Sequence, residues 1–166
     1  MTMETGWFEA VVYAEKIKAY GHPNIKGTHR TTFEITTEEE LTPRGDCIIG
    51  VKADKSAADL SSEFKQLARK KNTVMIIVLK INEHRDIVLA SGHPDLILTD
   101  KRKIIVRKST YIEPATIAVN ANKSARDIDR KLIEKLRDPR TVLEAWILLL
   151  DLNEIKPIDI NVGSIV

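Results

Sequence analysis

The chain lacks several features that would define its class. Cys47 is the only cysteine in 166 residues, which excludes an internal disulfide and suits a reducing compartment, so we expect a cytoplasmic protein. The longest apolar run, residues 145–150, is too short to cross a bilayer. The first eight residues lack the basic start and apolar stretch of a signal peptide. We therefore expect no membrane partner.

Strong charge of one sign and catalytic signatures are also missing. The chain has 26 basic and 24 acidic side chains, so no strong field attracts a phosphate backbone, and we do not expect a nucleic-acid partner. No Gly-x-Ser-x-Gly motif, phosphate-binding loop or paired-cysteine motif is present. The sequence therefore names no reaction.

The most informative feature that is present is an internal repeat. Residues 21–25 (GHPNI) return as residues 92–96 (GHPDL). Residues 51–57 (VKADKSA) return as residues 119–125 (VNANKSA). The sequence interval between the copies is nearly the same in both cases and differs only by a three-residue loop, so the pattern predicts a duplicated unit.

Hydrophobic patterning predicts the same order of elements, β-β-β-α-β, in each half. In the first half we expect strands over residues 8–19, 31–36 and 46–52, a helix over 57–71 and a strand over 73–81. In the second half the equivalents are strands over 86–91, 103–107 and 116–120, a helix over 126–137 and a strand over 141–150.

The predicted fold class is α+β, a β-rich sandwich or barrel with two main helices and a pseudo-twofold axis. No linker separates the halves, so we expect a single domain over residues 1–166 with repeats over 8–82 and 83–150. Residues 151–166 form a carboxyl-terminal extension. Its Pro157, Ile158 and Ile160 predict an extended segment on a sheet edge or on a neighbouring subunit.

Two local motifs refine this picture. Residues 41–49 (LTPRGDCII) are similar to the Gly-Asp box of cradle-loop barrels, whereas the second half has Glu113 and Pro114 at the matching positions, so sandwich and barrel both stay open. Ser56 with Asp59 and Ser124 with Asp127 predict capping boxes at the two helix starts. An alternative is that these helix starts hold a phosphate or carboxylate group.

Segments 21–25, 29–34 and 44–49 carry a further resemblance. Over roughly residues 9–149 the sequence resembles an archaeal family catalogued as a domain of unknown function. The resemblance implies a small, β-rich, cytoplasmic archaeal protein. It implies no activity, cofactor or substrate for particular residues.

Loop histidines are the first candidate site residues, because neutral imidazole is a common metal ligand and a general base near neutral pH. The alternative is that each Gly-His-Pro segment is only a turn. At equivalent positions, the first half has more chemically reactive side chains than the second half. This difference favours a site on loops 21–30 and 42–46, completed by the histidine of the second Gly-His-Pro turn. The candidate ligand-binding residues are His22, Asn24, His29, Arg44, Asp46 and His93.

Three functions remain. We favour a binding module for a small anionic ligand or nucleotide. The first alternative is a metal-dependent or histidine-based hydrolase or lyase, although no close pair has a recognised metal-site spacing, so the metal, the cofactor and the catalytic residues are unassigned. The second is a structural or assembly protein that forms a homo-oligomer. Cys47 alternates with Ile49 and Val51 and is interpreted as a core residue.

Overall fold

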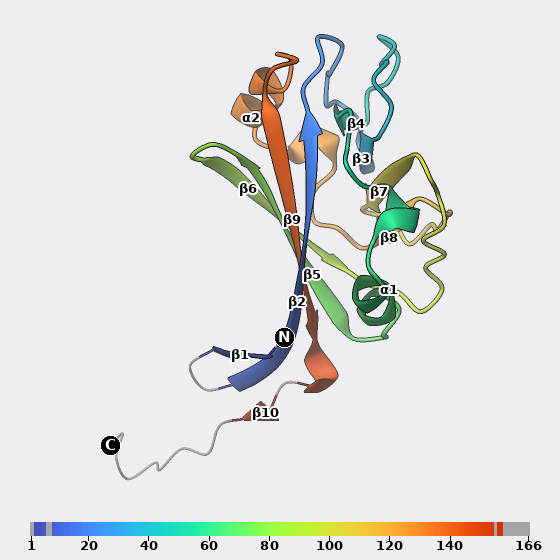
Figure 1. Ribbon diagram of the computed structural model, residues 1–166, viewed down its shortest axis with the longest axis vertical. Helices are drawn as coiled ribbons and strands as arrows, with labels where there is room; N and C mark the ends of the chain where they lie inside the picture. Colours follow the sequence, from blue (N-terminus) through green and yellow to red (C-terminus); the bar gives the residue numbers. More distant parts are fainter. Residues whose placement is uncertain (1, 6–7, 155, 158–166) are drawn as a thin grey trace.

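A long, twisted sheet forms one side of the molecule (Figure 1). The structure, a computed structural model, describes residues 2–5, 8–154 and 156–157. The strands of this large sheet run in the order β1-β2-β9-β5-β6, and β10 also pairs with β2. They are β1 (Thr2–Thr5), β2 (Phe8–Tyr20), β5 (Thr73–Ile81), β6 (His84–Ser91), β9 (Val142–Asp151) and β10 (Lys156–Pro157).

The second sheet is smaller and mixed. Its strand order is β4-β3-β7-β8, with β3 (Thr32–Thr36) antiparallel to β7 (Lys103–Arg107) at the centre. The outer strands β4 (Ile48–Gly50) and β8 (Thr116–Ala118) run parallel to their neighbours. Isolated bridges from Tyr20 to Val51 and from Ser91 to Val119 connect this sheet region to β2 and β6. Both sheets are open, so the barrel alternative is wrong.

Each predicted helix is split in two. The first half has a 3₁₀ turn, η1 (Ala57–Asp59), then α1 (Ser62–Ala68), and the second has η2 (Ala125–Asp127), then α2 (Arg130–Lys135). The break has a local cause, because Leu60 and Ile128 are extended and new N-caps follow them. The capping boxes therefore stabilise the 3₁₀ turns and not the α-helices.

One apolar core joins both sheets and both helices. The inner face of the large sheet contributes alternating residues such as Met75 and Ile147, which lie in the same cluster as Phe33 from the small sheet. Phe64 on α1 and Leu132 on α2 are buried in this cluster as well. The inner face of the large sheet is therefore covered, while its outer face alternates with partly exposed side chains.

Backbone contacts recur in pairs that match the repeat seen in the sequence. The N–H of Gly21 donates to the carbonyl of Thr141 at 3.0 Å, and the N–H of Gly92 donates to that of Thr73 at 2.9 Å. Each Gly-His-Pro turn thus packs on the helix and strand that follow the other turn in the chain. In the same way, the Tyr20 N–H donates to the carbonyl of Val51, and the equivalent Ser91 N–H donates to that of Val119. The Glu34 N–H donates to the carbonyl of Cys47, and the equivalent Ile105 N–H donates to that of Ala115.

The carboxyl-terminal extension reaches the edge of β2. In β10, Lys156 pairs with Glu9 and Pro157 with Phe8. This agrees with the extended edge segment expected around Pro157, whereas Ile158 and Ile160 lie outside the described residues. The short strand β1, which pairs with the start of β2, was not predicted.

Candidate functional site

The first Gly-His-Pro turn uses its histidine to hold the loop together. His22 Nδ1 accepts a hydrogen bond from the Asn24 N–H at 3.0 Å, and the His22 N–H donates to the carbonyl of Leu136 at the end of α2. The Asn24 side chain donates to the carbonyl of Leu41 at 2.7 Å. His22 and Asn24 therefore fasten loop 21–31 to α2 and to the loop before β4.

His29 has a similar role further along the same loop. Its Nδ1 lies 3.2 Å from the N–H groups of Thr31 and Thr32 and 3.0 Å from the Thr32 hydroxyl. The carbonyl of Asp46 accepts from the N–H groups of Thr28 and His29, so loops 21–31 and 41–47 are joined. Arg44 lies on the second loop with an exposed side chain.

His93 is held apart from these loops. Its Nδ1 accepts from the Asp95 N–H at 3.0 Å, and its own N–H donates to the carbonyl of Ala68 at the end of α1. The first turn packs on α2, near the top of Figure 1, and the second packs on α1, well below it. The structure thus brings five of the six candidate residues onto two joined loops and leaves His93 elsewhere.

No metal-binding arrangement forms in the described part of the chain. Across residues 2–5, 8–154 and 156–157, no three His, Cys, Asp or Glu side chains converge as metal ligands would. The candidate residues His22, His29, Asp46 and His93 are instead engaged in separate turn and loop contacts.

Cys47 is half-buried and lies outside the main core cluster, which corrects the core interpretation. Burial raises the pKa of its thiol to about 11, and the carboxylates of Glu34 and Asp46 add to the effect. The thiol is therefore protonated at neutral pH, and nucleophilic chemistry is not favoured.

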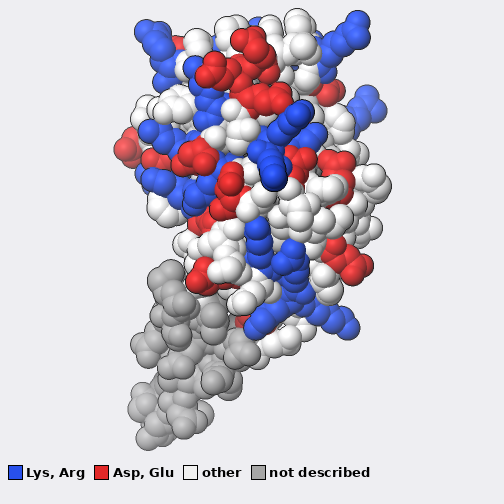
Figure 2. Space-filling view, turned by 45° about the vertical axis from the view of Figure 1, so that its right-hand side comes forward, with Lys and Arg blue, Asp and Glu red and all other residues white. Residues whose placement is uncertain are grey.

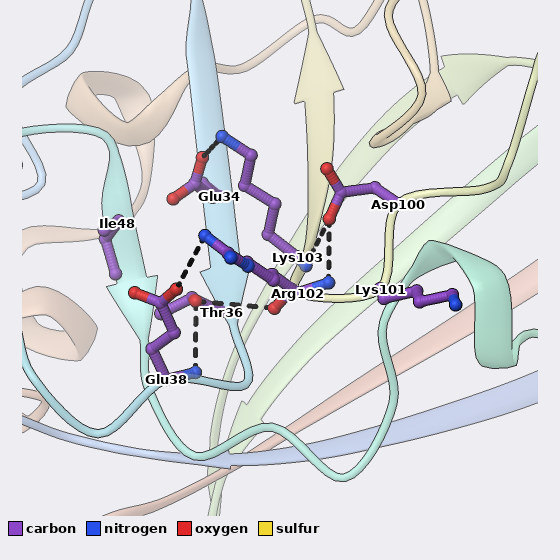
Figure 3. A pocket seen from close by; sticks show the side chains of 8 residues that line it. All are labelled: Glu34, Thr36, Glu38, Ile48, Asp100, Lys101, Arg102 and Lys103. Atoms are coloured by element: carbon purple, nitrogen blue, oxygen red, sulfur yellow. Dashed lines mark hydrogen bonds and ion pairs between the residues drawn. The ribbon is translucent and has the colours of Figure 1, made fainter.

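A pocket of about 380 Å³ lies on the small sheet beside β3 and the turn before β7 (Figure 3). Charged side chains of both signs line it and neutralise each other. Lys103 Nζ lies 3.5 Å from Glu34 Oε1, and Arg102 Nη1 lies 3.8 Å from Glu38 Oε1. The carboxylate of Asp100 accepts from the N–H groups of Arg102 and Lys103, while Lys101 points away in Figure 3.

Glu34 is the most unusual group in this pocket. It is buried in the middle of β3, whose five residues are all buried because both faces of the strand are covered. Burial raises the pKa of Glu34, and the nearby Lys103 ammonium partly offsets the rise. A carboxyl of this kind can hold or donate a proton closer to neutral pH than an exposed one.

A second, open hollow of about 460 Å³ lies between loop 21–31 and α2. Three basic residues and one acidic residue line it together with Ile25, Ile133 and Thr28. The basic residues are Lys26, Arg130 and Arg137, and the acidic residue is Glu134. Within the described part of the chain, Lys26 and Arg137 form no ion pair or side-chain hydrogen bond.

Arg130 is fixed in place at the edge of this hollow. Its Nε donates to the carbonyl of Ile128 at 2.9 Å and its Nη1 to that of Gly27 at 2.8 Å. Its Nη2 donates to the carbonyl of Ala125. The guanidinium therefore joins loop 21–31 to η2 and α2 and keeps a fixed positive charge at the edge of the hollow.

Sequence reasoning missed both the Glu34 pocket and the basic hollow. Glu34 shows only as one polar residue in an alternating strand, and its burial depends on the pairing of β3 with β7. Arg130 and Arg137 look like the solvated face of a helix. The basic residues at positions 26, 130 and 137 share no local motif, so only the fold brings them together.

The rest of the described surface gives a mixed electrostatic picture. Acidic and basic side chains interleave over the face shown in Figure 2. Several are paired, such as Arg107 with Glu113 at 2.9 Å and Lys108 with Asp127 at 2.8 Å. Among the described residues, no helix has the length and apolar character needed to span a membrane.

Comparisons with known proteins relate this chain to a family of unknown function. A family model described as a domain of unknown function (DUF371) matches residues 17–149. The uncharacterized protein MJ0206 from the archaeon Methanocaldococcus jannaschii is 46% identical over 127 residues, which cover 76% of this chain and 93% of that protein. The resemblance expected from the sequence is confirmed.

Proposed function

The chain belongs to the DUF371 family, and we propose that it is a binding module that holds a small anionic ligand in the hollow between loop 21–31 and α2. The observation that carries this proposal is the unbalanced charge of the hollow. Lys26, Arg130 and Arg137 face one carboxylate, Glu134, and two of the three cations have no partner among the described residues.

The fixed position of Arg130 supports the same function. Three of its five N–H donors are used by backbone carbonyls, so the guanidinium is held in one orientation before a ligand arrives. A cation that is already ordered loses little conformational entropy on binding. The remaining donors suit the oxygens of a phosphate or carboxylate group.

The equivalent place between loop 92–98 and α1 supports a role particular to the basic hollow. Arg69, which occupies the position equivalent to Arg137 in the repeat, donates through Nε to Leu96 O and through Nη2 to Ile97 O, both at 2.8 Å. Ile97 stands where the first half has Lys26. Arg69 therefore holds loop 92–98, and the place between this loop and α1 offers no matching pair of unpartnered cations among the residues described.

The Glu34 pocket is less suited to an anion. Two of its three cations are paired with its own carboxylates, and those carboxylates would repel an incoming anion. The basic hollow also has an apolar floor from Ile25 and Ile133. We therefore infer a ligand with a phosphate or carboxylate group and an apolar part, which includes a nucleotide.

The sequence-predicted residues take a supporting role in this proposal. His22, Asn24 and His29 shape loop 21–31, and the Asp46 carbonyl holds it from the side. Arg44 lies on the adjoining loop, where it can extend the basic surface. His93 performs the same turn function in the second half and is not part of the proposed site.

Calorimetric titration with inorganic phosphate, pyrophosphate and ADP tests the proposal. We expect at least one of these to bind, and Lys26→Ala and Arg137→Ala each to weaken its affinity by about tenfold, because each removes a charge-assisted contact. Lys101→Ala is the matched control, since it removes an exposed lysine outside the hollow and should leave affinity unchanged. Absence of binding by all three probes, or an equal loss in the control, would contradict the proposal.

We also propose that the chain arose by duplication of a β-β-β-α-β unit, with the repeats over residues 8–82 and 83–150 forming a two-layer sandwich in a single domain. The hydrogen bonds that match between the repeats and the shared core support this history. The single cysteine, which is free, supports a cytoplasmic location.

A further inference from the structure

The outer face of the large sheet carries an apolar patch. Along β5 and β9 the exposure alternates, and the residues that point outward are aliphatic or aromatic over most of their length. Ile87 and Leu89 on β6 are 48% and 47% exposed, and Trp146 on β9 is 36% exposed. The outward residues that form the outer patch are Ile76, Val78, Ile87, Leu89, Trp146 and Leu148.

Strand register places these side chains in two adjacent rows. In one row Ile76 lies opposite both Leu148 and Leu89. In the next row Val78 lies opposite Trp146 and Ile87. Because residues two apart on a strand share a face, the six side chains form a continuous surface across three strands.

No described element covers the outer patch. The helices and the small sheet pack on the opposite face of the large sheet, where Phe64, Phe33 and Leu132 join the core. The largest exposed apolar patch on a monomer is often functional, and larger patches mark interaction sites. The outer patch is therefore a candidate interaction surface.

We propose that the occupant is a second copy of this chain, packed face to face through the outer patch. Three strands and their neighbour β2, spaced about 4.8 Å apart and followed over six residues, give a footprint of about 400 Å². This is about half of the roughly 800 Å² per partner of a standard interface, so the outer patch fits a weak dimer that forms at high concentration. This inference does not depend on the anionic ligand.

The distribution of charge fits such an interface. The rows of the outer patch contain one cation, Lys16, whose ammonium lies 5.5 Å from the centre of the Trp146 ring. The next row has Lys18, Lys80 and Arg85 around Glu144. An apolar centre with a charged rim is the usual anatomy of a protein interface.

The charged row also selects the orientation of the two copies. A two-fold axis parallel to the strands would place the cations of one copy over those of the other, at a cost in repulsion. A two-fold axis that runs across the strands places the row of Lys18, Glu144, Lys80 and Arg85 over the opposite end of the partner's patch. That end lies near Leu150 and Ser91. We expect the second arrangement, in which two twisted sheets pack about 10 Å apart.

Sedimentation equilibrium of the full chain over a range of concentrations tests the proposal. We expect a dimer of about twice 18.7 kDa for the wild type. Ile87→Glu and Leu89→Glu should each lower the average mass to that of a monomer. Ile97→Glu is the matched control, because Ile97 is 41% exposed but lies in a loop outside the sheet, and it should stay dimeric.

Fluorescence of Trp146 gives a second measurement that leaves the outer patch unaltered. In a Trp7→Phe background, dilution through the dissociation range should shift the Trp146 emission to longer wavelength as the interface opens. The proposal would be overturned if the wild type remained an 18.7 kDa monomer at high concentration, or if Ile87→Glu and Leu89→Glu remained dimeric. A monomer that binds anionic phosphatidylglycerol vesicles through Ile87 and Leu89 would overturn it in favour of a lipid surface.

Discussion

Glu34 and Ile105 lie directly opposite each other where β3 pairs with β7, and they are separated by the same sequence interval that relates Gly21 to Gly92. The two positions are thus equivalent in the proposed repeat, and they meet where the halves join. One carries a carboxylate and the other an aliphatic side chain. The centre of the small sheet therefore holds a single buried acid, with Lys103 as its counter-ion.

The first prediction concerns the pH dependence that Glu34 imposes. Burial raises the pKa of Glu34, so the folded state binds its proton more tightly than the unfolded state does. Stability should fall as pH rises from the ordinary carboxyl range through the raised value. Glu34→Gln removes this effect. In urea denaturation from about pH 3.5 to 7, the free energy of unfolding of the variant should therefore rise relative to that of the wild type as pH rises.

Glu38→Gln is the control for that series, because Glu38 lines the same pocket but is 54% exposed. Its profile should run parallel to that of the wild type. A Glu34→Gln difference that is flat or declines with rising pH would show that burial does not govern this carboxyl.

The second prediction concerns the reactivity of Cys47. With its pKa raised to about 11, the thiol is almost fully protonated at pH 8. Alkylation by iodoacetamide should therefore be about 100-fold slower than that of a free thiol. Because the Glu34 carboxylate contributes to the rise, Glu34→Gln should speed the reaction. Reaction of the native wild type at the rate of glutathione would contradict the expected thiol pKa.

The third prediction concerns the glycines of the two Gly-His-Pro turns. A Cβ on Gly21 would collide with the carbonyl oxygens of Leu136 and Asp138, and one on Gly92 with that of Ala68. Backbone atoms cannot move aside cheaply, so Gly21→Ala and Gly92→Ala should each lower the free energy of unfolding by at least about 2 kcal/mol.

Gly45→Ala provides the comparison for these glycine variants. Its Cβ would meet the end of the Leu41 side chain, which can rotate, so the loss should be clearly smaller than at the two turns. Chemical denaturation of the three variants measures the difference. Equal losses at all three positions would mean that close backbone approach is not the cause.

The fourth prediction concerns the two capping serines. The carboxylate of Asp59 accepts from the N–H and hydroxyl of Ser56, and that of Asp127 does the same for Ser124. Both serines are fully buried. Ser56→Ala and Ser124→Ala should therefore each cost about 1–2 kcal/mol in chemical denaturation, whereas the exposed Ser62→Ala should cost much less.

Local patterns predict much of the fold but not its pockets. The Gly-His-Pro turns, the alternating strands and the capping aspartates depend on residues close together in the chain, so they can be read from it. The split helices cannot, because the apolar spacing of Leu60 and Phe64 suits a continuous helix as well as the observed break. The break depends on extended backbone at a single residue.

The candidate sites escape sequence reasoning for a different reason. Glu34 is buried by a strand pair that joins the two halves of the chain, and the basic hollow joins Lys26 to a helix near the other end of the sequence. The isolated histidines attract more attention, but their rings are used within their own turns. Residue type alone does not reveal which polar groups have partners.

The pairing of β2 with β9 has a consequence for synthesis of the chain. Tyr20 pairs with Val142, and at about 5–20 residues per second a ribosome needs roughly 6–25 s to make the intervening segment. During that time the edge of β2 that includes Ile17 and Ala19 lacks its partner strand. Until β9 has emerged, this edge of β2 is open to non-native pairing with other strands.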